Sequence, residues 1–128
     1  MKLLLDTHAA MWCVSERGKL SSKAKTMLLD EVHDLHVSIV SIWEIAIKIS
    51  LGKLPHFSGG TKAFLTLLEE IPVSLLAVMP RHVEVVETLP FIHRDPFDRL
   101  LIATAKADGM TILTADGNIR KYDVPSTW

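Results

Sequence analysis

Short apolar runs alternate along the chain with segments whose apolar side chains recur every three or four residues. Leu3–Leu5 is a continuous apolar run, and residues 35–39 alternate and are rich in β-branched side chains, as is typical of strands. The three-to-four spacing between such runs indicates helices with one apolar face. Together the patterns predict strands at residues 2–5, 35–39, 73–78 and 111–114, a short last strand at 122–124, and helices at 9–14, 21–31, 41–51, 61–70, 80–88 and 95–108.

The order of these elements predicts the fold class. Strands and helices alternate four or five times, and no repeat, low-complexity tract or interdomain linker interrupts them. Such alternation is typical of a parallel sheet with helices on both faces. We therefore expect a single domain over residues 1–128, of the α/β class, built as a three-layer α/β/α sandwich around a mostly parallel central sheet.

Composition and charge narrow the classes of function. The chain is 48% hydrophobic and 23% charged, which is typical of a globular domain and not of a disordered one. Its 14 basic side chains nearly balance 15 acidic ones, so bulk charge does not attract nucleic acid, although a local basic surface remains open. The single cysteine, Cys13, excludes an internal disulfide and a multi-cysteine zinc site.

A membrane segment is not expected. The most apolar stretch, residues 37–51, contains Glu44 and Lys48 and is shorter than the roughly 20 apolar residues that a bilayer span requires. Near the N-terminus, Asp6 comes too early for the apolar core of a signal peptide. We therefore expect a cytoplasmic protein with no membrane contact.

Four acidic residues stand where predicted strands end or where the following helices begin: Asp6, Glu44, Asp98 and Asp116. Each has an ordinary structural explanation. Asp6 is placed to cap the helix at 9–14, and Glu44 would complete a capping box that begins at Ser41. Asp98 falls in the first turn of a helix that Asp95 is placed to cap, and Asp116 precedes a turn glycine.

Taken together, the four acids predict a cation site. The carboxyl ends of parallel strands meet at one edge of a sheet, where ligands bind. Two carboxylates about 5 Å apart repel by roughly 3 kcal/mol at an effective dielectric of about 20, so such a cluster takes up protons or a cation. Oxygen ligands alone favour Mg²⁺ or Mn²⁺, ions that serve phosphate chemistry. Since the chain lacks a Gly-x-x-x-x-Gly-Lys loop, phosphodiester hydrolysis is a better prediction than nucleotide binding.

Four blocks of the chain resemble, in the same order, the PIN-domain ribonucleases of the VapC toxin type. They are Leu3–Trp12, Ser38–Lys48, His93–Ala103 and Ile112–Asp116, and they extend over essentially the whole chain. The resemblance implies a PIN-like fold, metal-dependent RNA cleavage, a VapB-type antitoxin partner and a homodimer. Asp6, Glu44 and Asp98 match the metal-site acids of the family, and Asp116 matches a fourth position that varies more.

Residues beside these acids are candidates for supporting roles. Asp95, Thr7 and Thr114 could support the site, although helix capping and strand packing explain them as well. The cations nearest in sequence to the acids are candidate RNA contacts: Lys48, Arg94 and Arg99.

Each of these cations has an alternative on a solvated helix face. Lys48 is also spaced to pair with Glu44 across one helical turn. Arg99 stands where many relatives carry a small residue.

Two histidines and two tryptophans also lie next to the acids in sequence. For His8 and His93 a structural or exposed position is expected more than a general-base role. For Trp12 and Trp43 we expect core packing, with a groove for an antitoxin segment as the alternative.

Two other functions remain open from the residues alone. The first is another metal-dependent phosphate-handling α/β domain, such as a phosphatase or a phospho-acceptor receiver. Receivers carry paired acids after the first strand and a lysine after the last, whereas Asp6 stands alone and Asp116 is acidic. The second is a non-catalytic interaction module in which all four acids are caps.

Overall fold

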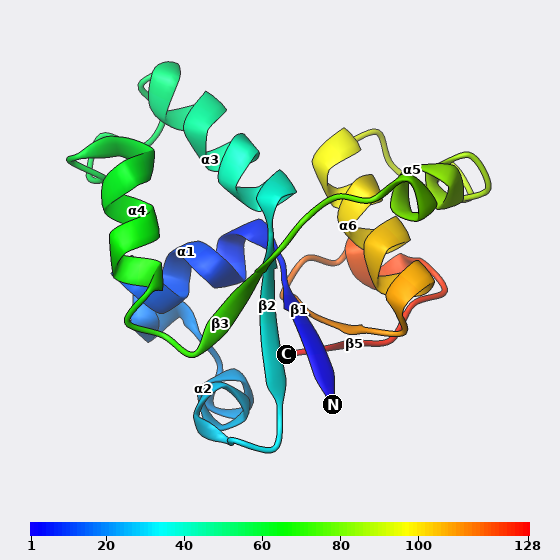
Figure 1. Cartoon of the computed structure of the whole chain (residues 1–128), viewed down its shortest axis with the longest axis horizontal. Helices are drawn as coiled ribbons and strands as arrows, with labels where there is room; N and C mark the ends of the chain where they lie inside the picture. Colours follow the sequence, from blue (N-terminus) through cyan, green and yellow to red (C-terminus); the bar gives the residue numbers. More distant parts are fainter.

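The computed structural model describes residues 1–128 and contains one five-stranded sheet (Figure 1). The strands are β1 (Lys2–Leu5), β2 (Asp34–Ser38), β3 (Val73–Leu76), β4 (Thr111–Leu113) and β5 (Ser126–Thr127). The helices are α1 (Thr7–Ser15), α2 (Ser22–Leu29), α3 (Ile39–Ser50), α4 (Gly60–Leu68), α5 (Pro80–Val86) and α6 (Pro96–Asp108), with 3₁₀ turns η1 (Arg17–Lys19) and η2 (Ile119–Lys121). No helix is long and apolar enough to cross a bilayer.

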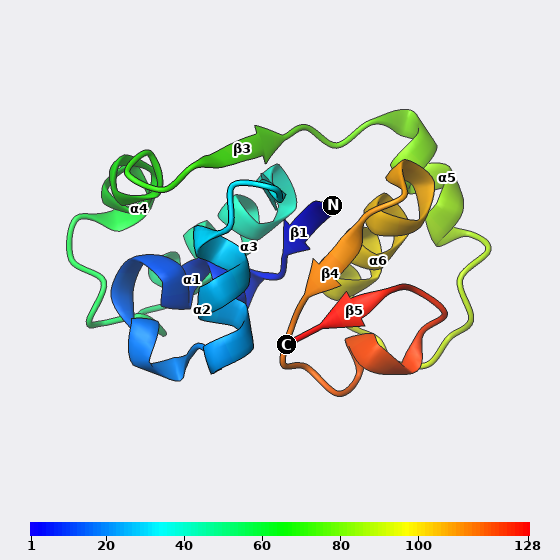
Figure 2. The same ribbon diagram turned by 90° about the horizontal axis from the view of Figure 1, so that it is seen from below.

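The sheet has the order β3-β2-β1-β4-β5, and every neighbouring pair is parallel. The central strand β1 is buried on both faces because its side chains alternate between two cores. Leu3 and Leu5 pack in a cluster with side chains of α1, α3 and α4, whereas Leu4 packs with side chains of α6 and η2. Figure 2 shows α1, α2 and α4 on one side of β1 and β4, and α5 and α6 on the other. The predicted three-layer α/β/α sandwich is therefore confirmed.

The start of α3 differs from the sequence prediction. The helix begins at Ile39, and Ser38 caps it by accepting a hydrogen bond from the Val40 N–H at 3.1 Å. The predicted capping box of Ser41 and Glu44 is wrong, because both residues lie inside the helix with buried side chains. Glu44 is consequently in the second turn of α3 and not in the first.

The predicted last strand at 122–124 is also wrong. Residues 119–121 form η2, and the chain pairs with β4 only at Ser126–Thr127. The short apolar stretch that indicated a strand instead packs into the core, where Tyr122 and Val124 join the cluster around α6. A loop that packs against the core buries alternate side chains here. Sequence periodicity alone does not distinguish such a loop from a strand.

Candidate active site

Asp6 follows β1 directly and is buried, with 3% of its surface exposed. One carboxylate oxygen, Oδ1, accepts the Ala9 N–H at 2.7 Å and so caps α1. The other, Oδ2, accepts a hydrogen bond from the hydroxyl of Thr114, which follows β4. Burial raises the pKa of Asp6, and these two hydrogen bonds partly oppose that rise. Asp6 is therefore both a cap and a buried carboxylate at the carboxyl edge of the sheet.

Glu44 reaches the same edge from α3. Its Oε1 lies 2.8 Å from the Thr7 hydroxyl, which in turn lies 3.0 Å from the Ser41 hydroxyl. Its Oε2 pairs with Lys48 at 2.9 Å, one helical turn along α3. Lys48 is thus paired with Glu44, which is the alternative that the sequence offered to an RNA contact. The pair offsets one negative charge of the site.

Asp98 lies in the first turn of α6, but it does not cap the helix. Asp95 is the N-cap, and its Oδ1 accepts the N–H groups of Phe97 and Asp98 at 2.9 and 3.1 Å. Burial raises the pKa of Asp98 to about 6, the hydrogen bond with His93 opposes this, and the negative charges of Asp95, Asp116 and Glu44 raise it further. Asp98 therefore carries a charge that the helix does not need for its cap.

A chain of hydrogen bonds fixes the orientation of Asp98. His93 Nε2 lies 3.0 Å from Asp98 Oδ2, and His93 Nδ1 lies 2.8 Å from the Tyr122 hydroxyl. The Tyr122 oxygen also accepts N–H groups from the His93 backbone and from Arg99, at 3.2 and 3.1 Å. Because those contacts leave the single hydroxyl proton for Nδ1, His93 Nε2 carries the proton that is donated to Asp98.

The prediction of Arg99 as an RNA contact or a solvated residue is wrong. Its side chain is buried, donates to the Pro90 carbonyl at 2.9 Å and lies over the Phe91 ring at 4.5 Å. It holds the 90–94 loop and Tyr122 in place. The part played by Tyr122 was missed because its partners are 23 and 29 residues away, and no local pattern marks such contacts.

Asp116 completes the acidic edge from the loop after β4. Its N–H donates to the Thr114 hydroxyl at 2.9 Å, and its Oδ1 accepts the Asn118 N–H at 2.7 Å. Asp116 and Asp6 both line an open cavity of about 200 Å³. Thr114 therefore connects the two acids, since it donates to Asp6 and accepts from Asp116.

The four acids share one edge of the sheet but not one point. No three acidic, histidine or cysteine side chains converge closely enough to form a ready-made metal site. Hydrogen bonds to Thr7, Thr114 and Lys48 hold Glu44 and Asp6 toward protein partners. The donor set nevertheless fits Mg²⁺ or Mn²⁺, because the acids supply only oxygen ligands and Mg²⁺ keeps several waters when it binds one or two carboxylates.

The remaining candidates lie around the acidic edge. Arg94 is exposed between His93 and Asp95, and His8 is exposed at the start of α1. Trp12 is half-buried against the core around α1, as expected, whereas Trp43 is 59% exposed, so core packing was a wrong prediction for it. Trp43 instead contacts the Phe97 ring edge-on at 5.1 Å, across the gap between α3 and α6.

A larger cavity elsewhere has no comparable chemistry. It measures about 410 Å³ and is lined mainly by apolar side chains of α1, α2 and the approach to β3. Burial raises the pKa of the Cys13 thiol in its wall to about 11, so that thiol is protonated and unreactive at neutral pH.

The fold and the site together define a class: an all-parallel α/β/α sandwich with buried carboxylates at the carboxyl edge of its central strands. The chain belongs to the PIN domain family, whose family model matches residues 3–125.

Known proteins support this assignment in sequence and in fold. The chain is 28% identical over 124 residues to Ribonuclease VapC22 of Mycobacterium tuberculosis (strain ATCC 25618 / H37Rv), covering 96% of this chain and 93% of that protein. It superposes on a chain of VapBC2 from Rickettsia felis, solved bound to a promoter DNA fragment, with a TM-score of 0.75, 12% identity and coverage of 99% and 98%. A chain of DNA-bound VapBC from Salmonella typhimurium gives a TM-score of 0.70, 14% identity and coverage of 99% and 97%.

Proposed function

We propose that this protein is a Mg²⁺- or Mn²⁺-dependent endoribonuclease that acts as the toxin of a VapBC-type toxin–antitoxin pair. The observation that carries the proposal is Asp98, a partly buried carboxylate with a pKa raised to about 6 that does not cap its helix and has no lysine or arginine partner. A perturbed carboxylate in a crevice is a candidate functional group. The likeness to Ribonuclease VapC22 indicates RNA as the substrate class.

The residues of this chain divide into ligands and supports. Asp6, Glu44 and Asp98 would hold the ion, with Asp116 as a fourth oxygen ligand. A bound divalent ion would activate water and neutralise charge that develops on the phosphate.

The supports orient and balance these ligands. Thr114 orients the Asp6 carboxylate and Thr7 the Glu44 carboxylate, while Lys48 offsets the charge of Glu44. Outer hydrogen bonds of this kind tune metal ligands.

Two regions outside the acids bear on partners. Arg94, exposed beside the acids, would contact RNA phosphates. Exposed apolar side chains at the sheet edge and in α5 would serve a homodimer: Leu75 is 50%, Met79 40% and Val83 54% exposed. Since the structural neighbours are VapBC complexes, a VapB-type antitoxin is the expected protein partner. A toxin of this kind would act in the cytoplasm.

RNA cleavage by the purified protein tests the proposal. We expect cleavage of single-stranded RNA with Mg²⁺, its loss with EDTA, and its loss in Asp6→Asn. Asparagine preserves the α1 cap because its side-chain oxygen also accepts the Ala9 N–H, so the variant should stay folded. A folded Asp6→Asn protein that cleaves RNA at the wild-type rate would contradict the assignment.

The two alternatives make different predictions. A receiver or phosphatase would form a phosphorylated aspartate with a labelled phosphate donor, and stable labelling of Asp6 would exclude the nuclease. An interaction module whose acids are all caps predicts no change in melting temperature with Mg²⁺. The cap role falls to Asp95 at α6, which leaves Asp98 unexplained by that alternative.

A further inference from the structure

The cavity beside Asp6 and Asp116 has an aromatic wall. Its other lining side chains are His8 and Trp12 of α1, with Ala115 beside them. The His8 and Trp12 rings have centroids 5.6 Å apart and planes inclined by 43°. The cavity is thus lined by two acidic and two aromatic side chains.

The spacing of the two residues puts both rings on one side of α1. Residues four apart on a helix are neighbours on its surface, so His8 and Trp12 form a continuous strip. Trp12 is held in place by the edge of the Trp128 ring at 5.6 Å and by the Lys19 ammonium, 5.9 Å from its ring centroid. His8 is exposed. In this wall Trp12 is therefore held by its neighbours, whereas His8 is open to solvent.

We propose that His8 and Trp12 form a nucleobase-stacking subsite for a nucleotide adjoining the scissile phosphate. The proposal rests on the proposed nuclease function, which places a cation and a phosphate at Asp6 and Asp116. The base is the planar group attached through the sugar to that phosphate, and aromatic faces bind bases by stacking. At about 200 Å³ the cavity is smaller than the roughly 300–1,000 Å³ of pockets for whole drug-sized ligands, which suits one base.

The subsite would select for the presence of a base more than for its identity. Every base has a π-face, so stacking tolerates any sequence, and the cavity lining offers no amide side chain that would read a base edge. Another aromatic contact, Trp43 with Phe97, does not line this cavity and provides a natural control.

The test compares ligands with and without a base. Adenosine 5′-monophosphate and ribose 5-phosphate both carry a phosphate but no phosphodiester to cleave, so their affinities can be measured by calorimetry with Mg²⁺ present. Wild-type protein should bind the nucleotide roughly 5- to 150-fold more tightly, as expected for about 1–3 kcal/mol of stacking. His8→Ala and Trp12→Leu should each reduce that ratio, and Trp12→Phe should largely restore it.

Matched controls separate stacking from general effects. His56→Ala removes another exposed histidine and Trp43→Leu another exposed tryptophan, and both should leave the affinity ratio unchanged. His8→Ala keeps the test valid if Trp12→Leu fails to fold, because His8 is exposed.

RNA cleavage by the same wild-type preparation distinguishes failure of the stacking subsite from failure of the proposed nuclease function. Active protein whose affinities for the nucleotide and the sugar phosphate are equal, or whose ratio is unchanged in His8→Ala and Trp12→Leu, would overturn the subsite alone. Protein that does not cleave RNA would overturn the proposed function.

Discussion

Helix α6 has an aspartate–histidine pair at each end, and the two pairs lie in opposite electrostatic environments. Asp98 lies 3.0 Å from His93 at the start of the helix, and Asp108 lies 2.8 Å from His82 at its end. Burial raises the pKa of Asp98 to about 6, whereas the hydrogen bond from Arg81 is the main reason why the pKa of Asp108 falls to about 2. An ionised aspartate beside a histidine therefore stabilises the fold at Asp108, whereas at Asp98 the negative charge is unfavourable.

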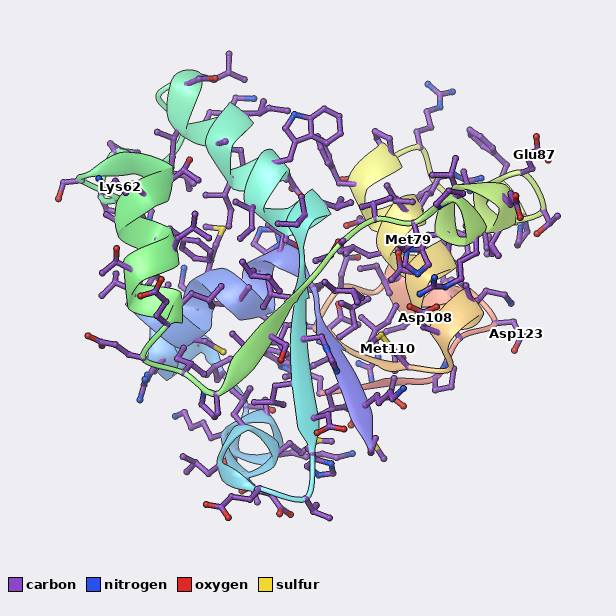
Figure 3. The ribbon with its side chains drawn as sticks, in the orientation of Figure 1. Lys62, Met79, Glu87, Asp108, Met110 and Asp123 are labelled. Atoms are coloured by element: carbon purple, nitrogen blue, oxygen red, sulfur yellow. The ribbon has the colours of Figure 1, made fainter.

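The difference comes from the neighbours. Arg81 donates to both carboxylate oxygens of Asp108, at 2.8 and 3.2 Å, and Figure 3 shows Asp108 at the end of α6 that joins β4. Asp98 has no arginine or lysine partner and lies near other acids. Residues that oppose stability in this way are expected at functional sites, where a ligand supplies the missing charge.

The largest expected difference between the pairs is in catalysis. Asp98→Asn should reduce Mg²⁺-dependent RNA cleavage by about 100-fold or more, since it would remove a proposed metal ligand worth several kcal/mol in the transition state. Asp108→Asn should stay within about twofold of wild type. Initial rates on a labelled RNA measure both, and similar losses in the two variants would remove the distinction between the pairs.

The next largest effect is on stability as a function of pH. The folded-state pKa of Asp98 lies above the ordinary value, so the folded protein binds the extra proton and, without metal, becomes more stable as pH falls from about 7 to about 4. The gain over that whole range is on the order of 2–3 kcal/mol for a shift from 3.8 to about 6. Denaturant unfolding with EDTA at several pH values measures it. Asp98→Asn should be more stable than wild type at pH 7 and show a much flatter profile; a less stable variant would contradict this.

Asp108 should behave in the opposite sense. Its pKa is lowered, so its contribution is present at neutral pH and is lost as pH falls from about 4 through about 2. Asp108→Asn should cost about 1–3 kcal/mol at pH 7, because asparagine keeps only one acceptor oxygen, so its amide NH2 group must face either the buried His82 N–H or the Arg81 guanidinium. Chemical denaturation at pH 7 measures this change in stability. An unchanged free energy of unfolding would contradict a stabilising role for the Asp108 contacts with Arg81 and His82, which join α6 to α5.

The smallest effects concern the arginines nearest to each pair. Arg94→Ala should raise the KM for RNA a few-fold without changing the melting temperature, because Arg94 is exposed beside the acids. Arg81→Ala should lower stability only slightly, as for a largely exposed ion pair, and leave KM unchanged. A change of KM in Arg81→Ala together with a loss of stability in Arg94→Ala would contradict the comparison of the two aspartate–histidine pairs.

Local patterns in the sequence predicted most of the fold. The apolar run of β1 and the helical periodicity of α6 each follow from side chains within a few residues of one another. The start of α3 was mispredicted because Ser38 and Ser41 are both suitable caps by type, and only tertiary packing turns Ser41 inward. The 122–124 segment failed for a related reason, since its alternation reflects core contacts of a loop.

The candidate site was predictable only in its acids. The positions of Asp6 and Asp116 after strands and of Asp98 at a helix start are visible in the sequence, whereas Glu44 lies one turn deeper in α3 than the sequence predicted. The His93–Tyr122–Arg99 contacts join residues far apart in the chain, as do those of Asp108 with Arg81. Nothing local distinguishes Asp98, which lacks a cation, from Asp108, which has one, because that difference arises from packing.

Calorimetric titration of Mg²⁺ tests the central claim most directly. With wild-type protein near pH 7.5, where Asp98 is ionised, the account predicts saturable binding; Asp108→Asn should bind equally well, and Asp98→Asn should bind much more weakly or not at all. Equal binding by the wild-type and Asp98→Asn proteins, or no binding by either, would contradict the claim that these acids form a divalent-cation site.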